Sequence, residues 1–264
     1  MKKKTPNGVI VYDEQIPEVA SFIDQLPTRV ETEGTTIHNK RNQIKVFEEG
    51  GHKLCVKRYA VPALGNRILY SLGLRAPKAK RHYDYAREII KRGFVTPRPY
   101  GYLIRYKNGF MSDSASVYEM VENVKSVGEN ILQNPALLRA FAAYTADLHK
   151  HGLMHRDYIL NNVLYAEDNG RYRFVLIDIN RFVFRSKPLG LFLTSVNMMQ
   201  PFHNEKQVRA FVREYERFRP MPKYFENLVV LFRKARTFYS HFKHFLKKFP
   251  GAKLLRGKYT NQQK

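Results

Sequence analysis

The sequence has little cysteine, few acidic residues and no long apolar run. Its single cysteine, Cys55, excludes an intramolecular disulfide and suits a reducing compartment. The most apolar stretches, such as Leu189–Val196, fall far short of the ~20 residues needed to span a bilayer. The basic start at residues 1–6 is followed by polar residues rather than by the apolar segment of a secretory signal. We therefore expect a soluble cytoplasmic protein.

The shortage of acidic residues leaves the chain strongly basic. The sequence has 46 Lys and Arg against 23 Asp and Glu, a net charge of +23. The electrostatic field of a chain with this net charge attracts polyanions, including nucleic acid, acidic phospholipid and phosphorylated glycolipid. A hydrophobic content of 44% argues against disorder, and we find neither internal repeats nor low-complexity linkers. The composition indicates a globular protein with an anionic partner.

The first half of the chain has the pattern of a small β-rich lobe with one helix. Short strands separated by turns are expected from about Val30 to Tyr59, with a hairpin turn at residues 49–52. Apolar residues at helical spacing predict a helix over Lys78–Lys91. A further strand, expected at Val117–Val121, leads out of this lobe as a strand-like connector.

The second half begins with a well-marked helix and continues as a mostly helical lobe. Asn134 is a suitable N-cap for that helix, and Gly152 follows its last turn. After a polar loop, two strands are expected at Val163–Tyr165 and Tyr172–Ile177, joined by a turn. Helices are expected beyond about Leu189.

The polar loop contains the strongest chemical signal. His155, Arg156 and Asp157 are followed by Asn162, which matches the pattern H-R-D-x-x-x-x-N of kinase catalytic loops. In that pattern the aspartate orients the acceptor hydroxyl and accepts its proton, and the asparagine binds Mg²⁺. The next hairpin delivers Asp178, 21 residues after Asp157, where a kinase fold places its second metal ligand. We therefore predict Asp157 as the catalytic carboxylate, with Asn162 and Asp178 as metal ligands.

A lysine from the first lobe completes the set that phosphoryl transfer requires. Lys57 lies on a predicted strand among apolar neighbours, where a buried ammonium would pair with nucleotide phosphates. The alternatives are a solvated strand lysine and an Asp–Asn turn held by side chain–backbone hydrogen bonds. The helix before the loop and the hairpin after it favour catalysis. His155 is expected to be a structural hydrogen-bonding residue, and Cys55 a small buried hydrophobe.

These residues resemble the Kdo/lipopolysaccharide kinase family, bacterial kinase-like enzymes that phosphorylate inner-core sugars of lipopolysaccharide. Besides the catalytic loop, the resemblance rests on Val56–Tyr59, Gly93–Pro99 and Leu176–Phe182, and it covers roughly residues 35–200. With the order of elements it implies an α+β, two-lobed protein-kinase-like fold. Its nucleotide-binding lobe would span residues 1–121 and its catalytic lobe residues 122–264.

The same resemblance implies the chemistry and the partner. It implies ATP and Mg²⁺ as cofactors and, as acceptor, a sugar hydroxyl (Kdo or heptose) on an anionic glycolipid, the lipopolysaccharide core. It also implies association with the inner face of the bacterial inner membrane.

The nucleotide-binding lobe departs from the protein-kinase pattern. No G-x-G-x-x-G sequence is present, and the stretch Asn39–Asn42 lies between the first two strands instead, so its backbone amides and Arg41 are candidates to hold phosphate. Arg41, Lys57, Glu119 and Val121 form the predicted nucleotide-binding set, the last two from the connector.

Two further departures concern the partner of Lys57 and the acceptor. The helix position at which kinases carry a glutamate for the strand lysine is occupied by His82, so the partner of Lys57 is left unassigned. Ile159 stands where Ser/Thr protein kinases commonly have lysine, and no Ala-Pro-Glu motif follows Asp178. Both features count against a protein substrate.

The C-terminal part is basic and amphipathic. From Asn227 to Lys264 it has ten Lys or Arg and no acidic residue. Its apolar stripe would either pack on the helical lobe or lie against anionic membrane lipid. Because no nucleic-acid module is recognisable, specific nucleic acid is not expected. The stripe comprises Leu228, Leu231, Phe232, Ala235, Phe238, Tyr239, Phe242, Phe245, Leu246 and Phe249, with Arg233, Lys234, Arg236, Lys243, Lys247 and Lys248 between them.

Our leading hypothesis is an ATP-dependent kinase of a sugar hydroxyl in the lipopolysaccharide inner core. One alternative is a kinase of a small soluble molecule or of a protein, which would share the catalytic residues and differ in the acceptor. The other is a catalytically inactive kinase fold that serves as a binding module for membrane or RNA.

Overall fold

The computed structural model describes residues 1–246 except residues 6, 62 and 63. These residues divide into two units, each described separately below. The first comprises Met1–Asn123 with Ile177–Asn180, and the second Val124–Leu176 with the chain from Arg181 onward. The short segment 177–180 therefore belongs by its contacts to the first unit, although the chain on either side of it belongs to the second.

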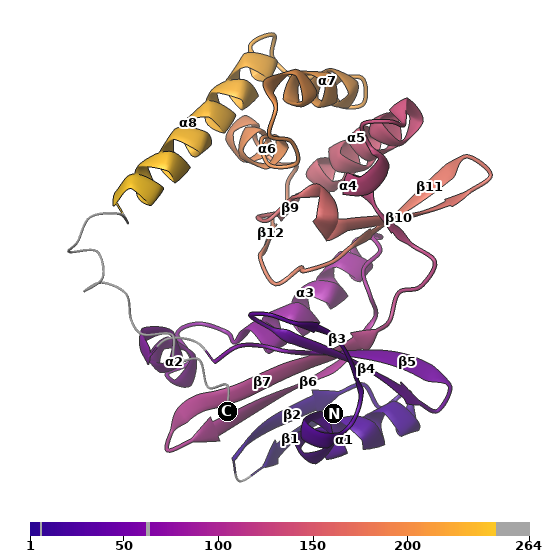
Figure 1. The fold of residues 1–264 in the computed structure, drawn as a ribbon, viewed down its shortest axis with the longest axis vertical. Coiled ribbons are helices and arrows are strands. Elements are labelled where there is room, and N and C mark those ends of the chain that lie inside the picture. The colour runs from indigo at the N-terminus through magenta and orange to yellow at the C-terminus, as the bar shows by residue number, and fades with distance from the viewer. Residues whose placement is uncertain (6, 62–63, 247–264) are drawn as a thin grey trace. The chain divides into compact units, whose positions relative to one another are not determined.

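The first unit is built on one antiparallel sheet (Figure 1). Its described strands run in the order β1-β2-β6-β7-β5-β4-β3. The hairpin predicted around residues 49–52 is confirmed, since β4 and β5 pair directly on either side of it. The strands are β1 (Lys2–Thr5), β2 (Gly8–Tyr12), β3 (Thr35–Asn39), β4 (Gln43–Glu49), β5 (His52–Arg58), β6 (Pro99–Lys107) and β7 (Phe110–Glu119).

Helices cover both faces of this sheet (Figure 1). On one face α1 (Pro17–Thr32) buries its apolar side chains against strand residues such as Leu54 and Val56. On the other face α2 (Leu64–Ser71) and α3 (Lys78–Lys91) contribute to a second buried cluster that includes Tyr59. Because side chains alternate along a strand, β6 supplies both clusters, with Leu103 in the first and Tyr102 in the second.

The predicted helix over residues 78–91 is confirmed, but the expectation of one helix in this unit is wrong. The α1 helix extends to Thr32, so residues 30–32 are helical and not the start of a strand. Local signals conceal α1: its N-cap, Ile16, makes no side-chain cap, and Pro27 lies inside the helix. Burial of its apolar face on the sheet, a tertiary effect, outweighs both.

The second unit combines helices with two small sheets. One sheet has the strand order β11-β10-β8, and β12 pairs with β9 in the other. The elements are β8 (Lys125–Ser126), α4 (Val127–Asn130), α5 (Pro135–Lys150), β9 (Leu153–His155), the 3-10 turn η1 (Leu160–Asn162), β10 (Val163–Asp168), β11 (Arg171–Leu176), β12 (Phe182–Phe184), α6 (Leu191–Met198), α7 (Glu205–Glu216) and α8 (Phe225–Leu246).

The helix α5 has the predicted ends. The side chain of Asn134 accepts a hydrogen bond from the backbone N–H of Leu137 at 2.9 Å. At the other end Gly152 has a φ of 72°, and a Cβ at this position would collide with the carbonyl oxygen of Arg185. The sharp turn at Gly152 directs the chain into β9 and the loop that follows.

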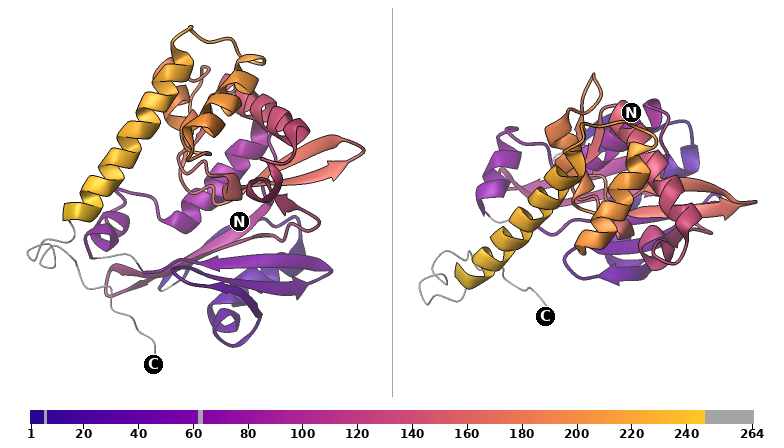
Figure 2. Two further views of the ribbon diagram at one scale, coloured as in Figure 1. Left: turned by 45° about the horizontal axis from the view of Figure 1, so that its top comes forward. Right: turned by 90° about the horizontal axis from the view of Figure 1, so that it is seen from above.

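The basic C-terminal helix is confirmed as α8, up to Leu246. Its first turns pack against α6 and α7 and bury Phe225, Val229 and Val230. Its C-terminal half projects beyond those two helices (Figure 2). The predicted continuation through Lys247, Lys248 and Phe249 lies outside the described residues. Of the helices that the structure describes, none combines the length and apolarity needed to cross a membrane.

Candidate active site

Lys57 is positioned by the alternation of β5. Leu54 and Val56 face the core beneath α1, so Lys57 points to the opposite face of the sheet, on which α3 packs. The lysine is 8% exposed. Burial of an ammonium at this depth requires an anionic partner or hydrogen-bond acceptors.

That partner is Asp178. The Lys57 Nζ lies 2.8 Å from the Asp178 Oδ1, and the Asn180 Nδ2 donates a second hydrogen bond of 2.8 Å to the same oxygen. Asp178 has a φ of 51°, in the left-handed region that non-glycine residues rarely adopt. Residues held in such backbone conformations cluster at functional sites, where their neighbours fix them.

His82 on α3 occupies the helix position that the sequence left open. Its ring is 4% exposed and lies against the Tyr118 ring, with 4.7 Å between centroids. Burial, with a smaller effect of the nearby Lys57 charge, lowers the pKa of His82 to about 3. The imidazole is therefore neutral at physiological pH, and the anionic partner of Lys57 comes from the segment around Asp178 instead.

In the second unit, the candidate catalytic loop follows β9 and is fixed at its start. Strand β9 pairs with β12, which places His155 opposite Phe182. The Nδ1 of the buried His155 accepts a hydrogen bond of 3.1 Å from the backbone N–H of Asp157. His155 thus serves as a hydrogen-bonding residue of the loop, as expected.

Asp157 is held through its backbone and remains accessible through its side chain. The Asn162 Nδ2 donates a hydrogen bond of 2.8 Å to the carbonyl oxygen of Asp157. The Arg181 guanidinium lies 3.6 Å from the Asp157 Oδ2, and the aspartate side chain is 36% exposed. A carboxylate in this setting is oriented, and a hydroxyl can still reach it from solvent.

A buried polar chain supports the loop from behind. The Asn197 Nδ2 donates a hydrogen bond of 2.8 Å to the carbonyl oxygen of His155. The Oδ1 of the same amide lies 2.9 Å from the His149 Nε2, and the Tyr215 hydroxyl lies 2.9 Å from the His149 Nδ1. Because an amide oxygen can only accept, His149 donates from Nε2 and accepts at Nδ1. Burial lowers the pKa of His149 to about 4, which keeps this neutral form.

The structure brings some of the predicted site residues together and leaves others apart. Lys57 and Asp178 meet in the first unit, and Asp157 and Asn162 meet in the second. The other three predicted residues lie on elements that carry neither pair. Arg41 is exposed in the turn between β3 and β4, Glu119 is the exposed last residue of β7, and Val121 is half-buried just after it.

Sequence reasoning missed Asn180, Arg181 and Asn197. The first two follow Asp178 by two and three positions in the run Asp-Ile-Asn-Arg, so their nearness in sequence to a candidate metal ligand was the available signal. Asn197 had no such signal, because it reaches His155 only through the packing of α6.

The two candidate metal ligands have the chemistry that Mg²⁺ prefers. Asp178 supplies a carboxylate, and Asn162 an amide whose Nδ2 is engaged by the Asp157 carbonyl, so that its oxygen is the remaining ligand atom. Mg²⁺ in nucleotide sites is bound by one or two protein oxygens together with substrate phosphates and water. Each of these two oxygen donors by itself suits this cation.

Comparisons with known proteins bear on the family and the fold. The model of the lipopolysaccharide kinase (Kdo/WaaP) family matches residues 29–190. A solved structure of WaaP in complex with acyl carrier protein is similar, with a TM-score of 0.61, 17% identity and coverage of 87% of this chain and 99% of that one. A microcompartment-associated aminopropanol kinase has a TM-score of 0.54, 12% identity and coverage of 81% and 86%. None of the curated proteins compared with the chain matches it. The predicted α+β, protein-kinase-like fold is confirmed.

Proposed function

Because the chain belongs to the lipopolysaccharide kinase (Kdo/WaaP) family, we propose that it phosphorylates a sugar hydroxyl of the lipopolysaccharide inner core, on Kdo or heptose. Membership of this family makes it a kinase with a hydroxyl acceptor, and the family implies ATP as the phosphoryl donor and a glycolipid as substrate. The observation that carries the proposal is the catalytic loop, in which Asp157 is tethered by Asn162 and faced by Arg181.

Asp157 is the proposed catalytic residue. Its carboxylate would accept a hydrogen bond from the acceptor hydroxyl, orient the oxygen toward the γ-phosphorus, and take the proton as the new P–O bond forms. The Asn162 tether at the Asp157 carbonyl and the hydrogen bond from the Asp157 N–H to His155 hold the backbone during this step. Arg181, 3.6 Å from the Asp157 Oδ2, would help to direct the carboxylate.

Asn162 and Asp178 are the proposed Mg²⁺ ligands. Held there, Mg²⁺ would supply neutralisation of the charge on the phosphates. Lys57 would hold the nucleotide phosphates, which requires its ammonium to be shared between phosphate and the Asp178 carboxylate. We further propose that Arg41, Glu119 and Val121 contact the nucleotide. Arg41 would use its exposed guanidinium, and the other two would act from the end of β7 and the segment after it.

We also propose that the C-terminal half of α8 contacts anionic membrane lipid, where a glycolipid substrate would be found. The large side chains of Phe238, Tyr239, Phe242 and Phe245 are 73%, 64%, 47% and 57% exposed. Cationic residues share this helix, and each contributes about 1 kcal/mol near an anionic surface. Exposed aromatic side chains between cations are typical of interfacial helices.

The kinase proposal is tested by a conservative substitution at the loop. Asp157→Asn keeps the size of the side chain and removes the proton acceptor, so transfer of ³²P from ATP to purified lipopolysaccharide core should fall by about 10²-fold or more. Nucleotide should still bind, as measured by isothermal titration with Mg-ATP. Asp168→Asn is the matched control, because this exposed aspartate ends β10 and should leave turnover unchanged.

Two outcomes would contradict the proposal at different points. Wild-type turnover by Asp157→Asn would overturn the catalytic assignment. If the wild-type protein phosphorylated small soluble alcohols and not the lipopolysaccharide core, the assignment of kinase activity would stand and the proposed glycolipid acceptor would be wrong.

A further inference from the structure

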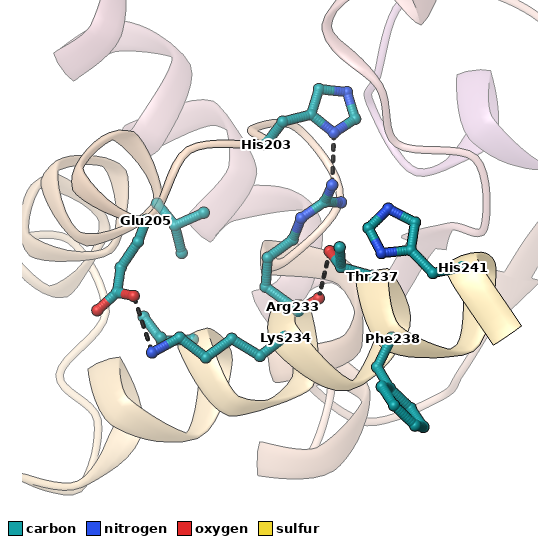
Figure 3. Close-up of a pocket in the computed structure, with 9 residues that line it drawn as sticks. His203, Glu205, Arg233, Lys234, Thr237, Phe238 and His241 are labelled. Atoms are coloured by element: carbon teal, nitrogen blue, oxygen red, sulfur yellow. Dashed lines mark hydrogen bonds and ion pairs between the residues drawn. The ribbon is translucent and has the colours of Figure 1, made fainter.

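A cavity of about 340 Å³ lies in the second unit, and none of the residues that line it belongs to the catalytic loop. It is formed by the segment before α7, by α7 itself and by α8 (Figure 3). Its volume is within the range of small-molecule sites. The lining combines charged and polar side chains, the carboxylate of Glu205 included, with apolar ones; His203, Arg233, Lys234, His241, Val208 and Phe238 are among the others.

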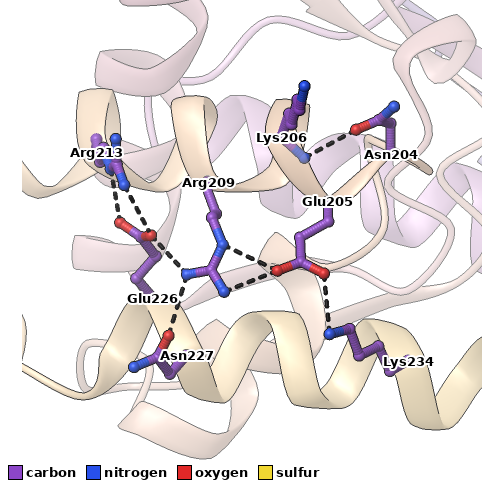
Figure 4. Close-up of polar contacts among 8 residues, drawn as sticks. All are labelled: Asn204, Glu205, Lys206, Arg209, Arg213, Glu226, Asn227 and Lys234. Carbon is purple, nitrogen blue, oxygen red and sulfur yellow. Dashed lines mark hydrogen bonds and ion pairs between the residues drawn. The ribbon is translucent and has the colours of Figure 1, made fainter.

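Two other cations of α7 and α8, Arg209 and Lys234, are balanced by carboxylates. Arg209 lies 2.8 Å from Glu205 and 2.7 Å from Glu226, and it also donates to Asn227 (Figure 4). Lys234 lies 2.9 Å from the other oxygen of Glu205. The two glutamates are therefore already engaged by cations other than Arg233.

Arg233 is the exception. Its guanidinium donates from Nη2 to the His203 Nδ1 at 2.5 Å (Figure 3). Its Nε is buried and has no hydrogen-bond partner among the residues that the structure describes. Over the same residues, no carboxylate lies within ion-pair distance of this guanidinium, whereas Arg209 has two.

The partner of Arg233 is itself uncharged. Because the guanidinium only donates, the His203 Nδ1 must accept, which places the ring proton on Nε2. Burial and the charge of Arg233 lower the pKa of His203, and burial and the charge of Arg236 lower the pKa of Arg233. Arg233 thus carries a half-buried positive charge that neither its partner nor its surroundings balance.

We propose that this cavity binds a phosphate group, with Arg233 as its principal ligand. The planar fork of a guanidinium matches phosphate oxygens, and its buried Nε would gain the acceptor that it lacks. His241 lines the same cavity and is placed to add a second donor (Figure 3). The apolar lining by Val208 and Phe238 would accommodate the group that carries the phosphate, whether the source is a lipid headgroup or a soluble ester.

This proposal goes beyond the kinase reaction, since the cavity contains none of the proposed catalytic or metal-binding residues. A phosphate bound at Lys57 would not respond to a change at Arg233. Dependence of binding on Arg233 therefore distinguishes the cavity from the nucleotide site.

The test measures binding of two probes to the full chain: inorganic phosphate and soluble dihexanoyl phosphatidic acid. Titration calorimetry and thermal unfolding are run against sodium chloride of equal ionic strength, so that general screening is subtracted. We expect Arg233→Gln to weaken binding of at least one probe by about tenfold or more, since a charge-assisted hydrogen bond is lost. Arg233→Lys should retain part of the affinity.

The matched control is Arg236→Gln, which removes the same charge from an exposed position of the same helix that does not line the cavity. It should lose far less affinity than Arg233→Gln, because the charge of Arg236 reaches the cavity but its side chain does not line it. Phosphatidic acid binding alone, lost in Arg233→Gln, assigns the site to a lipid headgroup, and equal binding of inorganic phosphate assigns it to phosphate from any source.

Three results would overturn the proposal. The first is that neither probe binds wild-type protein more tightly than chloride. The second is that Arg233→Gln and Arg236→Gln lose affinity equally. The third is a combination of two observations. Arg233→Gln in chloride unfolds at a much lower temperature than the wild-type protein, and Arg233→Lys binds phosphate no better than chloride. Together these would make Arg233 a structural residue.

Discussion

Lys57 on β5 and Asp178, 121 residues further along the chain, form an ion pair with 2.8 Å between Nζ and Oδ1. The lysine side chain is 10% exposed and the aspartate side chain 40% exposed. The pair is therefore buried at one end and open at the other. For a phosphate to bind the Lys57 ammonium, this ammonium must interact with the phosphate and with Asp178 at the same time. For a cation to bind the Asp178 carboxylate, this carboxylate must interact with the cation and with Lys57.

A second buried lysine provides a contrast within the same sheet. Lys45 on β4 is as buried as Lys57, each residue being 8% exposed as a whole, but its Nζ donates to the carbonyl oxygens of Val30 and Glu33, each at 2.8 Å. These carbonyls end α1, so Lys45 caps a helix C-terminus. Lys57→Met should lower kcat by about 10²-fold or more and change stability little. Lys45→Met should lower the free energy of unfolding by about 1–3 kcal/mol and leave kcat unchanged.

Urea unfolding and steady-state kinase assays on both variants check this separation. A loss of stability without loss of turnover in Lys57→Met would show that the lysine is structural.

The buried side-chain amide of Asn197 should help to hold the catalytic loop in place, although Asn197 lies far from that loop along the chain. Asn197→Leu removes the partners of the His155 carbonyl and of the His149 ring, and each unsatisfied group costs about 1–3 kcal/mol. We expect lower stability and, because the loop loses its support, a fall in kcat that is larger than any rise in the KM for ATP. Asn204→Ala, which removes the cap of α7, is the control that lowers stability without a change in kcat.

Identical kcat values for Asn197→Leu and Asn204→Ala at a temperature where both are folded would contradict the link between Asn197 and the loop.

The local parts of this structure could be predicted from the sequence, and the reason is visible in particular residues. The Asn134 cap, the turn at Gly152 and the spacing from Asp157 to Asn162 are all short-range signals. Each depends on backbone chemistry within a few residues. The helix α5, the loop and the following hairpin were therefore recognisable in order.

Long-range contacts were beyond that reach. The pairing of Lys57 with Asp178 joins residues that no local pattern connects, and the sequence pointed instead to the helix position of His82. The helix α1 was missed because packing on the sheet, rather than propensity, stabilises it. The imbalance between Arg209 and Arg233 likewise depends on which glutamates their helices bring near.

His149 should make the fold sensitive to acid. Its pKa is about 4 in the folded protein, below the ordinary value of 6.5, so the unfolded chain binds the proton more tightly. The contribution of neutral His149 to the free energy of unfolding is therefore fully present above pH 6.5 and is lost as the pH falls toward 4. Between pH 7 and pH 5 this histidine alone should cost about 2 kcal/mol of unfolding free energy. His149→Gln should reduce the acid-dependent loss by that amount, and the exposed His151→Gln should not.

Urea titrations at the two pH values measure the difference. His82, with its pKa of about 3, adds a loss of stability of the same sign, so part of the acid-dependent loss should remain in His149→Gln. A pH profile of His149→Gln that matches the wild-type profile would show that His149 is not held neutral.

Exposed aromatic residues on α8 should carry the membrane contact. Wild-type protein should co-float with vesicles that contain phosphatidylglycerol at physiological salt. The double substitution of Phe242→Ser with Phe245→Ser should lower the bound fraction by about tenfold, because two apolar side chains no longer enter the interface. Since both are exposed, the melting temperature should stay the same. Leu72→Ser with Leu74→Ser, two side chains of the first unit that are even more exposed, is the control that should still float. Higher salt should weaken flotation of the wild-type protein, because cations on α8 act together with the aromatic residues.

Equal flotation of the two double variants would place the contact elsewhere, and absence of wild-type flotation would favour a soluble acceptor.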